Sequence, residues 1–144
     1  MRGLVAIAAL GLAVGTSASA ATGPEAVVDA FHAALAKGDT AGAAALLADD
    51  ALIFEEGHAE RSKAEYAARH LPADAEFAKA VRTTMTRRAS RSVGGVAWVA
   101  SEGRLNGTFR GRAIDRMSTE TMILQRTNRG WKIRHVHWSS SAAP

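Results

Sequence analysis

Residues 118–141 read STETMILQRTNRGWKIRHVHWSSS. Apolar and polar side chains alternate on both sides of Asn128-Arg129-Gly130, a tripeptide typical of a turn. The alternation predicts two long strands, residues 113–126 and 131–140, paired as a β-hairpin.

The same period of two extends toward the N-terminus. Residues 82–93 and 96–109 predict two further strands, which Gly94-Gly95 would join. Residues 107–111, with a glycine at each end, supply the turn into the closing hairpin. Four consecutive strands joined by short turns predict an antiparallel meander.

Before residue 82 the apolar period is helical. Val27, Phe31 and Leu35 recur every four residues, Pro24 suits a first helical turn, and Lys37-Gly38 suits a helix end. Asp39-Thr40 predicts the start of a second helix. Residues 51–54 predict a short strand, and residues 55–61 a polar turn.

A third helix should begin at Ser62-Lys63-Ala64-Glu65, which has the spacing of a capping box. It places Tyr66 and His70 on one face, and Pro72 should end or kink it. One or two further helical turns are expected before residue 82. Helices followed by a meander predict an α+β fold.

The first twenty residues have the pattern of a cleavable export signal. Arg2 precedes an apolar run, residues 4–14, and Ala18-Ser19-Ala20 is a small-x-small cleavage sequence. We expect cleavage after Ala20, one folded domain over residues 21–144, a periplasmic or secreted location and no membrane contact after cleavage. The chain has no cysteine, which excludes thiol catalysis and cysteine-bound zinc.

Charge gives little reason to expect a nucleic-acid partner. Without Arg2 the chain carries 17 basic and 14 acidic side chains, a formal charge of +3. The local basic stretch, Arg82, Arg87, Arg88 and Arg91, has no aromatic side chains interleaved for base stacking. We expect no nucleic-acid binding.

The phrase VVDAFHAALAKGDTAGAAALLADDALIF (residues 27–54) and the closing hairpin together resemble the SnoaL-like branch of the nuclear transport factor 2-like superfamily. The closing hairpin is also similar to the association domain of calcium/calmodulin-dependent protein kinase II. The resemblance implies a cone-shaped, cystatin-like fold: four long antiparallel strands and a short one curve around three or four helices. It also implies a pocket at the open end and a homodimer formed through the outer sheet face.

The last strand leaves two arrangements open. Trp131, Ile133, His135 and His137 share one face of a regular strand, yet the other face also becomes apolar at Val136 and Trp138. Either both faces are covered or a β-bulge exchanges them.

The resemblance aligns pocket arginines of the kinase domain with Ala100, Met122 and Trp138, so a cationic pocket for carboxylates is not expected. On this alignment Trp138 lines the pocket and the histidines face a dimer partner. In the alternative, His135 and His137 lie inside beside Tyr66 and His70.

Three functions follow from these residues. The first is binding of a small apolar or aromatic ligand, with or without a role as a dimeric interaction module. Its expected pocket residues are Tyr66, His70, Trp98, Glu102, Arg104, Met122 and Trp138. The second is an isomerase, cyclase or dehydratase, with acid–base candidates His135, His137, Glu120 and Tyr66. The third is a metal site among His135, His137, His58 and His70. No cofactor is expected.

Overall fold

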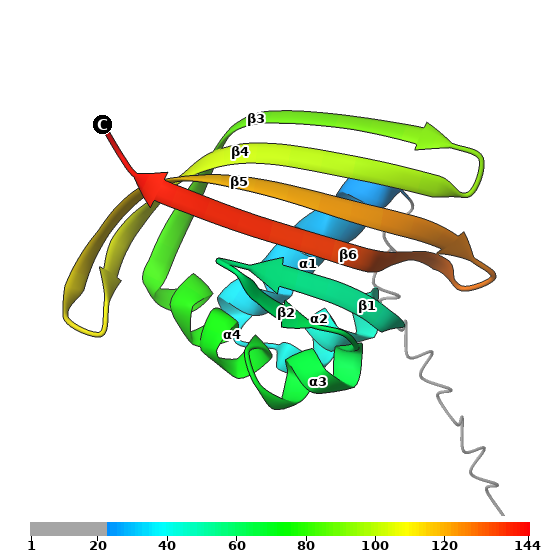
Figure 1. Cartoon of the computed structure of the whole chain (residues 1–144), viewed down its shortest axis with the longest axis horizontal. Helices are drawn as coiled ribbons and strands as arrows, with labels where there is room; N and C mark the ends of the chain where they lie inside the picture. Colours follow the sequence, from blue (N-terminus) through cyan, green and yellow to red (C-terminus); the bar gives the residue numbers. More distant parts are fainter. Residues whose placement is uncertain (1–22) are drawn as a thin grey trace, which may run out of the picture.

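The computed structural model describes residues 23–144, and the predicted export signal lies outside them. Four helices and six strands follow one another (Figure 1). Their order is α1 (Pro24–Lys37), α2 (Thr40–Leu46), β1 (Leu47–Glu55), β2 (His58–Glu60), α3 (Lys63–Ala68), α4 (Leu71–Ala80), β3 (Val81–Val93), β4 (Val96–Phe109), β5 (Arg112–Thr127) and β6 (Gly130–Ala142).

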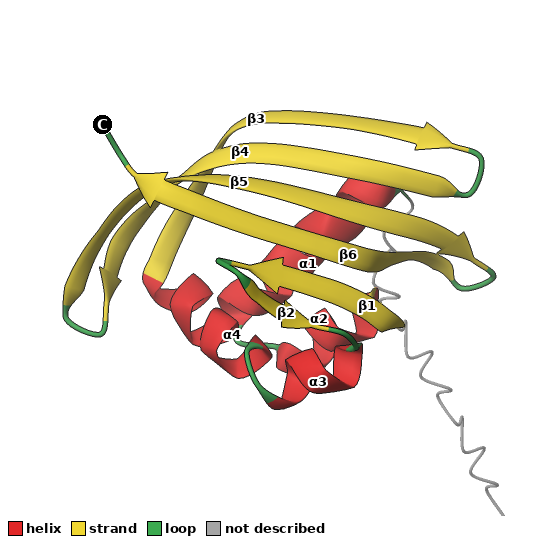
Figure 2. Cartoon of the chain, viewed as in Figure 1, coloured by secondary structure: helices red, strands yellow, loops and turns green. Residues whose placement is uncertain are grey.

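The strands form one sheet in the order β2-β1-β6-β5-β4-β3, and the helices lie together on one of its sides (Figure 2). The long strands bend at the end nearest α4, which gives the sheet its curvature (Figure 1). The predicted α+β class and curved sheet are confirmed. The four long strands start and end within two residues of the predicted positions.

The sheet differs from the expected one in two respects. It is mixed, because β1 pairs with β6 in parallel, whereas every other pairing is antiparallel. It also has a sixth strand, since the predicted polar turn contains β2. Glu56 and Gly57 both have positive φ (46° and 87°), as a tight hairpin turn requires, and the chain reverses there to pair β2 with β1.

The helix signals act largely as predicted. Gly38 ends α1 with φ 75°, and Ser62 Oγ accepts a hydrogen bond from Glu65 N at 3.1 Å at the start of α3. Pro72 lies in the first turn of α4, where its missing N–H costs nothing. Because the proline starts this helix, α4 extends over ten residues rather than the one or two turns expected. No helix among residues 23–144 is long and apolar enough to cross a membrane.

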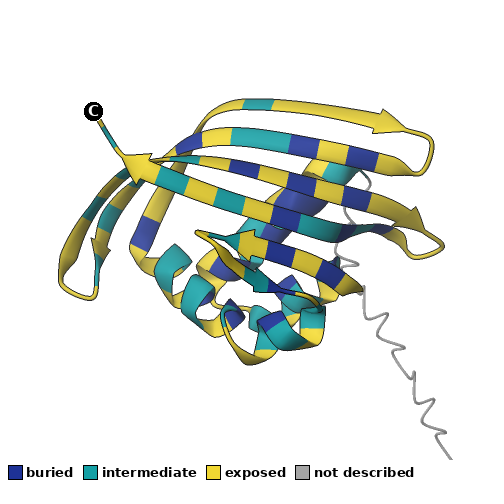
Figure 3. Cartoon of the chain, viewed as in Figure 1, coloured by how far each residue is buried: buried dark blue, intermediate teal, exposed yellow. Residues whose placement is uncertain are grey.

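The core lies between the helices and the concave sheet face (Figure 3). Its largest fully buried side chains include Phe31 of α1 and Tyr66 of α3, and the sheet contributes buried aliphatic side chains. These are Leu47, Ile53, Val99, Met122, Leu124, Ile133 and Val136.

A bulge in β6 decides which side chains face this core. Leu124 pairs with Ile133 but Ile123 pairs with His135, so Arg134 is an extra residue. Before it, Trp131 and Ile133 are buried; after it, Val136 is buried and His137 is exposed. The exchange of faces is therefore the explanation for the apolar residues on both sides of the predicted strand.

Candidate functional site

A cavity of about 970 Å³ lies between α1, α4 and the curved sheet. Apolar side chains form much of its wall, among them Leu35, Phe77, Leu105, Phe109 and Trp138. Its size is within the range of sites that enclose small organic molecules. Polar and charged side chains also line the cavity, and its buried carboxyl groups lie in two clusters along the wall.

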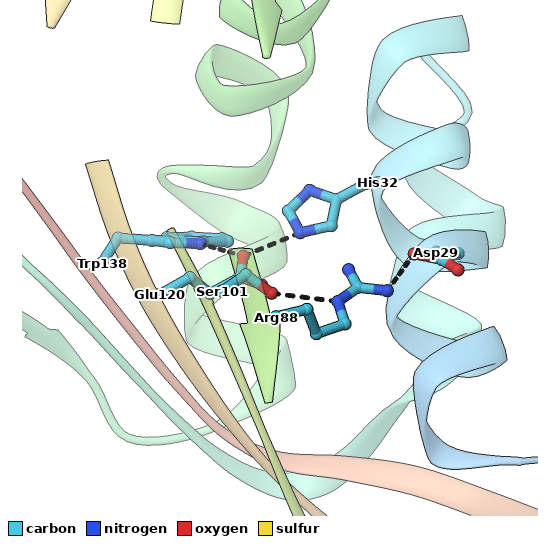
Figure 4. Close-up of polar contacts among 6 residues, drawn as sticks. All are labelled: Asp29, His32, Arg88, Ser101, Glu120 and Trp138. Atoms are coloured by element: carbon cyan, nitrogen blue, oxygen red, sulfur yellow. Dashed lines mark hydrogen bonds and ion pairs between the residues drawn. The ribbon is translucent and has the colours of Figure 1, made fainter. Parts of the chain in front are cut away.

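The first polar group centres on Glu120, which is only 9% exposed. Glu120 alternates with the core residues Met122 and Leu124 on β5, so its side chain must point inward. Its Oε2 accepts a hydrogen bond from Trp138 Nε1 at 2.6 Å and lies 2.7 Å from His32 Nε2 (Figure 4). Its Oε1 is buried with no hydrogen-bond partner among the described residues.

The surroundings keep Glu120 ionised. Burial raises the pKa of this carboxyl group, but His32, the Trp138 indole and the charge of Arg88 together outweigh burial. The pKa of Glu120 is consequently below its ordinary value.

Arg88 forms the next part of the same wall. Its Nε donates to Ser101 Oγ at 3.1 Å, and its Nη1 donates to Asp29 Oδ1 at 2.7 Å (Figure 4). The ion pair connects β3 with α1, one helical turn before His32. Since Asp29 balances the charge of Arg88, this guanidinium is not an isolated cation in the cavity wall.

The second polar group contains Tyr66, Asp74 and Glu55. The hydroxyl of the fully buried Tyr66 donates to Asp74 Oδ2 at 2.6 Å. Asp74 and Glu55 line the cavity, whereas Tyr66 lies behind Asp74. Burial raises the pKa of Asp74, although the Tyr66 hydrogen bond and the His70 charge oppose it. Burial, with Asp74 and Glu56 nearby, raises the pKa of Glu55 to about 7.

Several expected pocket residues lie elsewhere. Trp98 pairs with Ile123 in the β4–β5 ladder, while Val99 pairs with Met122. Paired residues share a face, so Trp98 is on the outer face, 41% exposed, and Met122 is in the core. The expectation that Trp98 and Met122 line the pocket is therefore wrong, whereas Trp138 does line the cavity.

The remaining candidates are distributed between the cavity wall, the surface and the sheet edge. Glu102 is exposed and lines the cavity, and Arg104 is paired with Asp115 on the surface at 2.6 Å. His70 contacts Glu60 of β2, next to the sheet edge, and is not part of the cavity wall.

His135 and His137 lie on the outer face next to Phe54, with ring centroids 5.0 and 6.4 Å from it. The arrangement that placed them inside beside Tyr66 and His70 is wrong, because the bulge at Arg134 turns them outward. Residues 23–144 contain no group of three or more ligating side chains placed to hold a metal ion. The four histidine candidates thus form no metal centre in the described chain.

The titratable residues of the site that were not among the candidates include His32, Glu55 and Asp74. Glu55 continues the inward alternation of Ala51 and Ile53, and this signal is visible in the sequence. His32 follows Phe31 of the α1 apolar stripe, which places it beside the core. Nothing in the sequence pairs His32 with a glutamate 88 positions away.

Glu55 predicts a pH dependence of stability. The pKa of Glu55 is about 7 in the fold and 4.5 ordinarily, so the folded chain binds the proton more tightly. The stability that the proton on Glu55 gives the folded chain is complete below pH 4.5, and it is lost as the pH rises through 7. Glu55→Gln should therefore raise the Tm relative to wild type at pH 8 and change it little at pH 4, measured by circular dichroism. Asp50→Asn, exposed on the same strand, is the control, and an equal Tm gain for Glu55→Gln at both pH values would contradict the prediction.

Comparison with known proteins gives the family. Residues 25–144 match the SnoaL-like domain. A candidate ketosteroid isomerase from Shewanella frigidimarina is 38% identical, with a TM-score of 0.75, over 78% of this chain and 91% of that one. A candidate NTF2-like dehydratase from Streptomyces avermitilis (19% identity, 81% and 92% coverage, TM-score 0.69) shares the fold.

A candidate calcium/calmodulin-dependent protein kinase II association domain from Xanthomonas campestris also shares the fold (22% identity, 83% and 85% coverage, TM-score 0.68). No curated protein sequence matches the chain. The family match covers nearly every described residue, and the chain belongs to the SnoaL-like domain family.

Proposed function

We propose that the domain binds a small, largely apolar organic molecule in the cavity between α1, α4 and the sheet. The observation that carries this proposal is the cavity itself, about 970 Å³ with a largely apolar surface and buried carboxyl groups. The charges favour a neutral ligand over an anion. The acidic side chains of the wall outnumber the basic ones: Asp29, Glu55, Glu56, Asp74, Glu102 and Glu120 against Lys79, Arg82, Arg88 and Arg110. Arg88 and Arg110 are also paired with acidic side chains.

Filling the cavity should abolish binding of an apolar probe. Ala36 of α1 lines the cavity, and Ala26 is an exposed position of the same helix outside it. Ala36→Trp should weaken binding of the neutral dye N-phenyl-1-naphthylamine at least about tenfold, because the indole occupies the space that the dye needs. Ala26→Trp should bind like wild type in the fluorescence titration. Equal binding by all three proteins would place the dye elsewhere.

A second candidate function is proton transfer on the bound molecule. It is favoured by Glu55, whose pKa of about 7 lets it both accept and release a proton near neutral pH. The 38% identical candidate ketosteroid isomerase makes a steroid ketone a reasonable first substrate. In this proposal Glu55 removes a proton from the carbon next to the carbonyl and returns it at another carbon.

The test is the conversion of 5-androstene-3,17-dione to its conjugated isomer, followed by enone absorbance. For wild type, kcat/KM should rise with pH up to about 7 as Glu55 ionises. Glu55→Gln should lower kcat/KM by about 100-fold or more, since an amide cannot accept the proton. The surface variant Asp50→Asn should match wild type. Turnover unaffected by Glu55→Gln would exclude Glu55 as the base.

We further propose that two copies associate through the outer sheet face. Leu52, Phe54, Trp98 and Ile123 are all exposed there, between 38% and 41%, and His135 and His137 lie beside Phe54. The SnoaL-like resemblance implies a dimer through this same face.

Native mass spectrometry should show a dimer for wild type and a monomer for Phe54→Asp, because the new charge would be buried in the interface. Val93→Asp introduces the same charge at an exposed apolar residue of the β3–β4 hairpin end and should leave the dimer intact. A wild-type monomer at micromolar concentration would refute this interface.

A further inference from the structure

We propose that His32 contacts the bound ligand and recognises a hydroxyl group on it, held in position by Glu120 and Trp138. This inference rests on the proposed small-molecule cavity and specifies the class of ligand: a cyclic, mostly apolar compound that carries a hydroxyl group. His32, Glu120 and Trp138 all line that cavity.

Three elements fix the imidazole. His32 comes from α1, Glu120 from β5 and Trp138 from β6, and they meet at one atom, Glu120 Oε2 (Figure 4). That oxygen accepts from Trp138 Nε1 at 2.6 Å and lies 2.7 Å from His32 Nε2. The carboxylate has no hydrogen to donate, so the short contact requires the hydrogen to be on Nε2 of His32.

The other ring nitrogen is therefore the one available to a ligand. Nδ1 of neutral His32 carries a lone pair, and within residues 23–144 it has no hydrogen-bond partner. The His32 side chain is 42% exposed and lies in the cavity wall, so a bound molecule can approach it. A lone pair at this position accepts a hydrogen bond, which a ligand hydroxyl donates and an ether or a carboxylate does not.

The unpartnered oxygen of Glu120 strengthens this preference. Oε1 is buried without a hydrogen bond, so only one oxygen of this carboxylate is satisfied. A carboxylate with an oxygen left free of hydrogen bonds stabilises a hydrogen-bond donor or a positive charge beside it. When the ligand O–H bond breaks, the proton forms a new N–H bond at Nδ1 and the electron pair stays on the ligand oxygen. Glu120 then faces the resulting imidazolium, and the proton returns by the reverse path.

The aromatic surroundings favour a ring on the ligand. The rings of Phe31 and Trp138 stack, with centroids 6.3 Å apart and an interplanar angle of 22°. This stacking fixes the plane of the Trp138 ring next to Glu120 and His32. Phe77 and Phe109, whose centroids are 5.2 Å apart, line the same cavity. These rings suit planar or cyclic carbon skeletons.

A purely structural role for His32 makes a different prediction. If the His32–Glu120 contact only attaches α1 to the sheet, its loss should lower the free energy of unfolding and leave ligand selectivity unchanged. Selectivity between two ligands that differ only in the hydroxyl hydrogen therefore separates the two roles. The probes are 2-naphthol and 2-methoxynaphthalene.

Isothermal titration should show that wild type binds 2-naphthol about ten- to a hundredfold more tightly than 2-methoxynaphthalene, the effect expected for a hydrogen bond in a charge-coupled group. His32→Phe should bind both equally, and Trp138→Phe should reduce the preference, because Glu120 loses a donor that fixes it. His58→Phe, at an exposed histidine of β2 that does not line the cavity, should retain the full preference. Nitrogen-15 NMR should place the neutral His32 hydrogen on Nε2.

Equal binding of the two probes by wild type would overturn the hydroxyl inference, as would a preference that survives in folded His32→Phe or a hydrogen found on Nδ1. His32→Gln tests the same point if His32→Phe fails to fold. Failure of wild type to bind either naphthalene or N-phenyl-1-naphthylamine would instead refute the cavity proposal itself. The two failures are thus distinguishable.

Discussion

One extra residue in β6, Arg134, sets the chemistry of both sheet faces. Strand side chains alternate strictly, so a single inserted residue moves every later side chain to the other face. Trp138 is thereby turned into the cavity and His135 and His137 are turned out of it. Without the bulge the cavity would contain two imidazoles, and Glu120 would lose the indole N–H that fixes one of its oxygens.

The cavity exists because curvature separates the sheet from the helices at one end. Near β1 and the first part of β6, Phe31, Met122 and Ile133 fill the space completely. Toward the bent end, the side chains between α1, α4 and the sheet leave the cavity open. Pairing offsets the cost of burying polar groups there, as for Tyr66 with Asp74 and for His32 with Glu120.

The two polar groups differ in their electrostatics although both contain carboxyl groups. Glu120 faces a histidine, an indole N–H and Arg88, so its charged form is stabilised. Glu55 is partly buried and also faces the acidic side chains Asp74 and Glu56, so its neutral form is favoured. One cavity therefore offers an ionised carboxylate and a carboxyl group that titrates near neutral pH, an arrangement typical of sites that move protons.

The sequence by itself determined most of the helices and strands, although not β2 or the start of α4. Turn residues and alternation located β3 to β6, and the caps at Gly38 and Ser62 located the ends of helices, because these signals act between residues that are close in the chain. The inward alternation of Ala51, Ile53 and Glu55 could also have identified one site carboxyl group.

Only the tertiary structure decided the parallel β1–β6 pairing, the bulge at Arg134 and the contact of His32 with Glu120. Each depends on the register between segments far apart in the chain. Register is set by how whole faces pack against one another, and no local spacing encodes it.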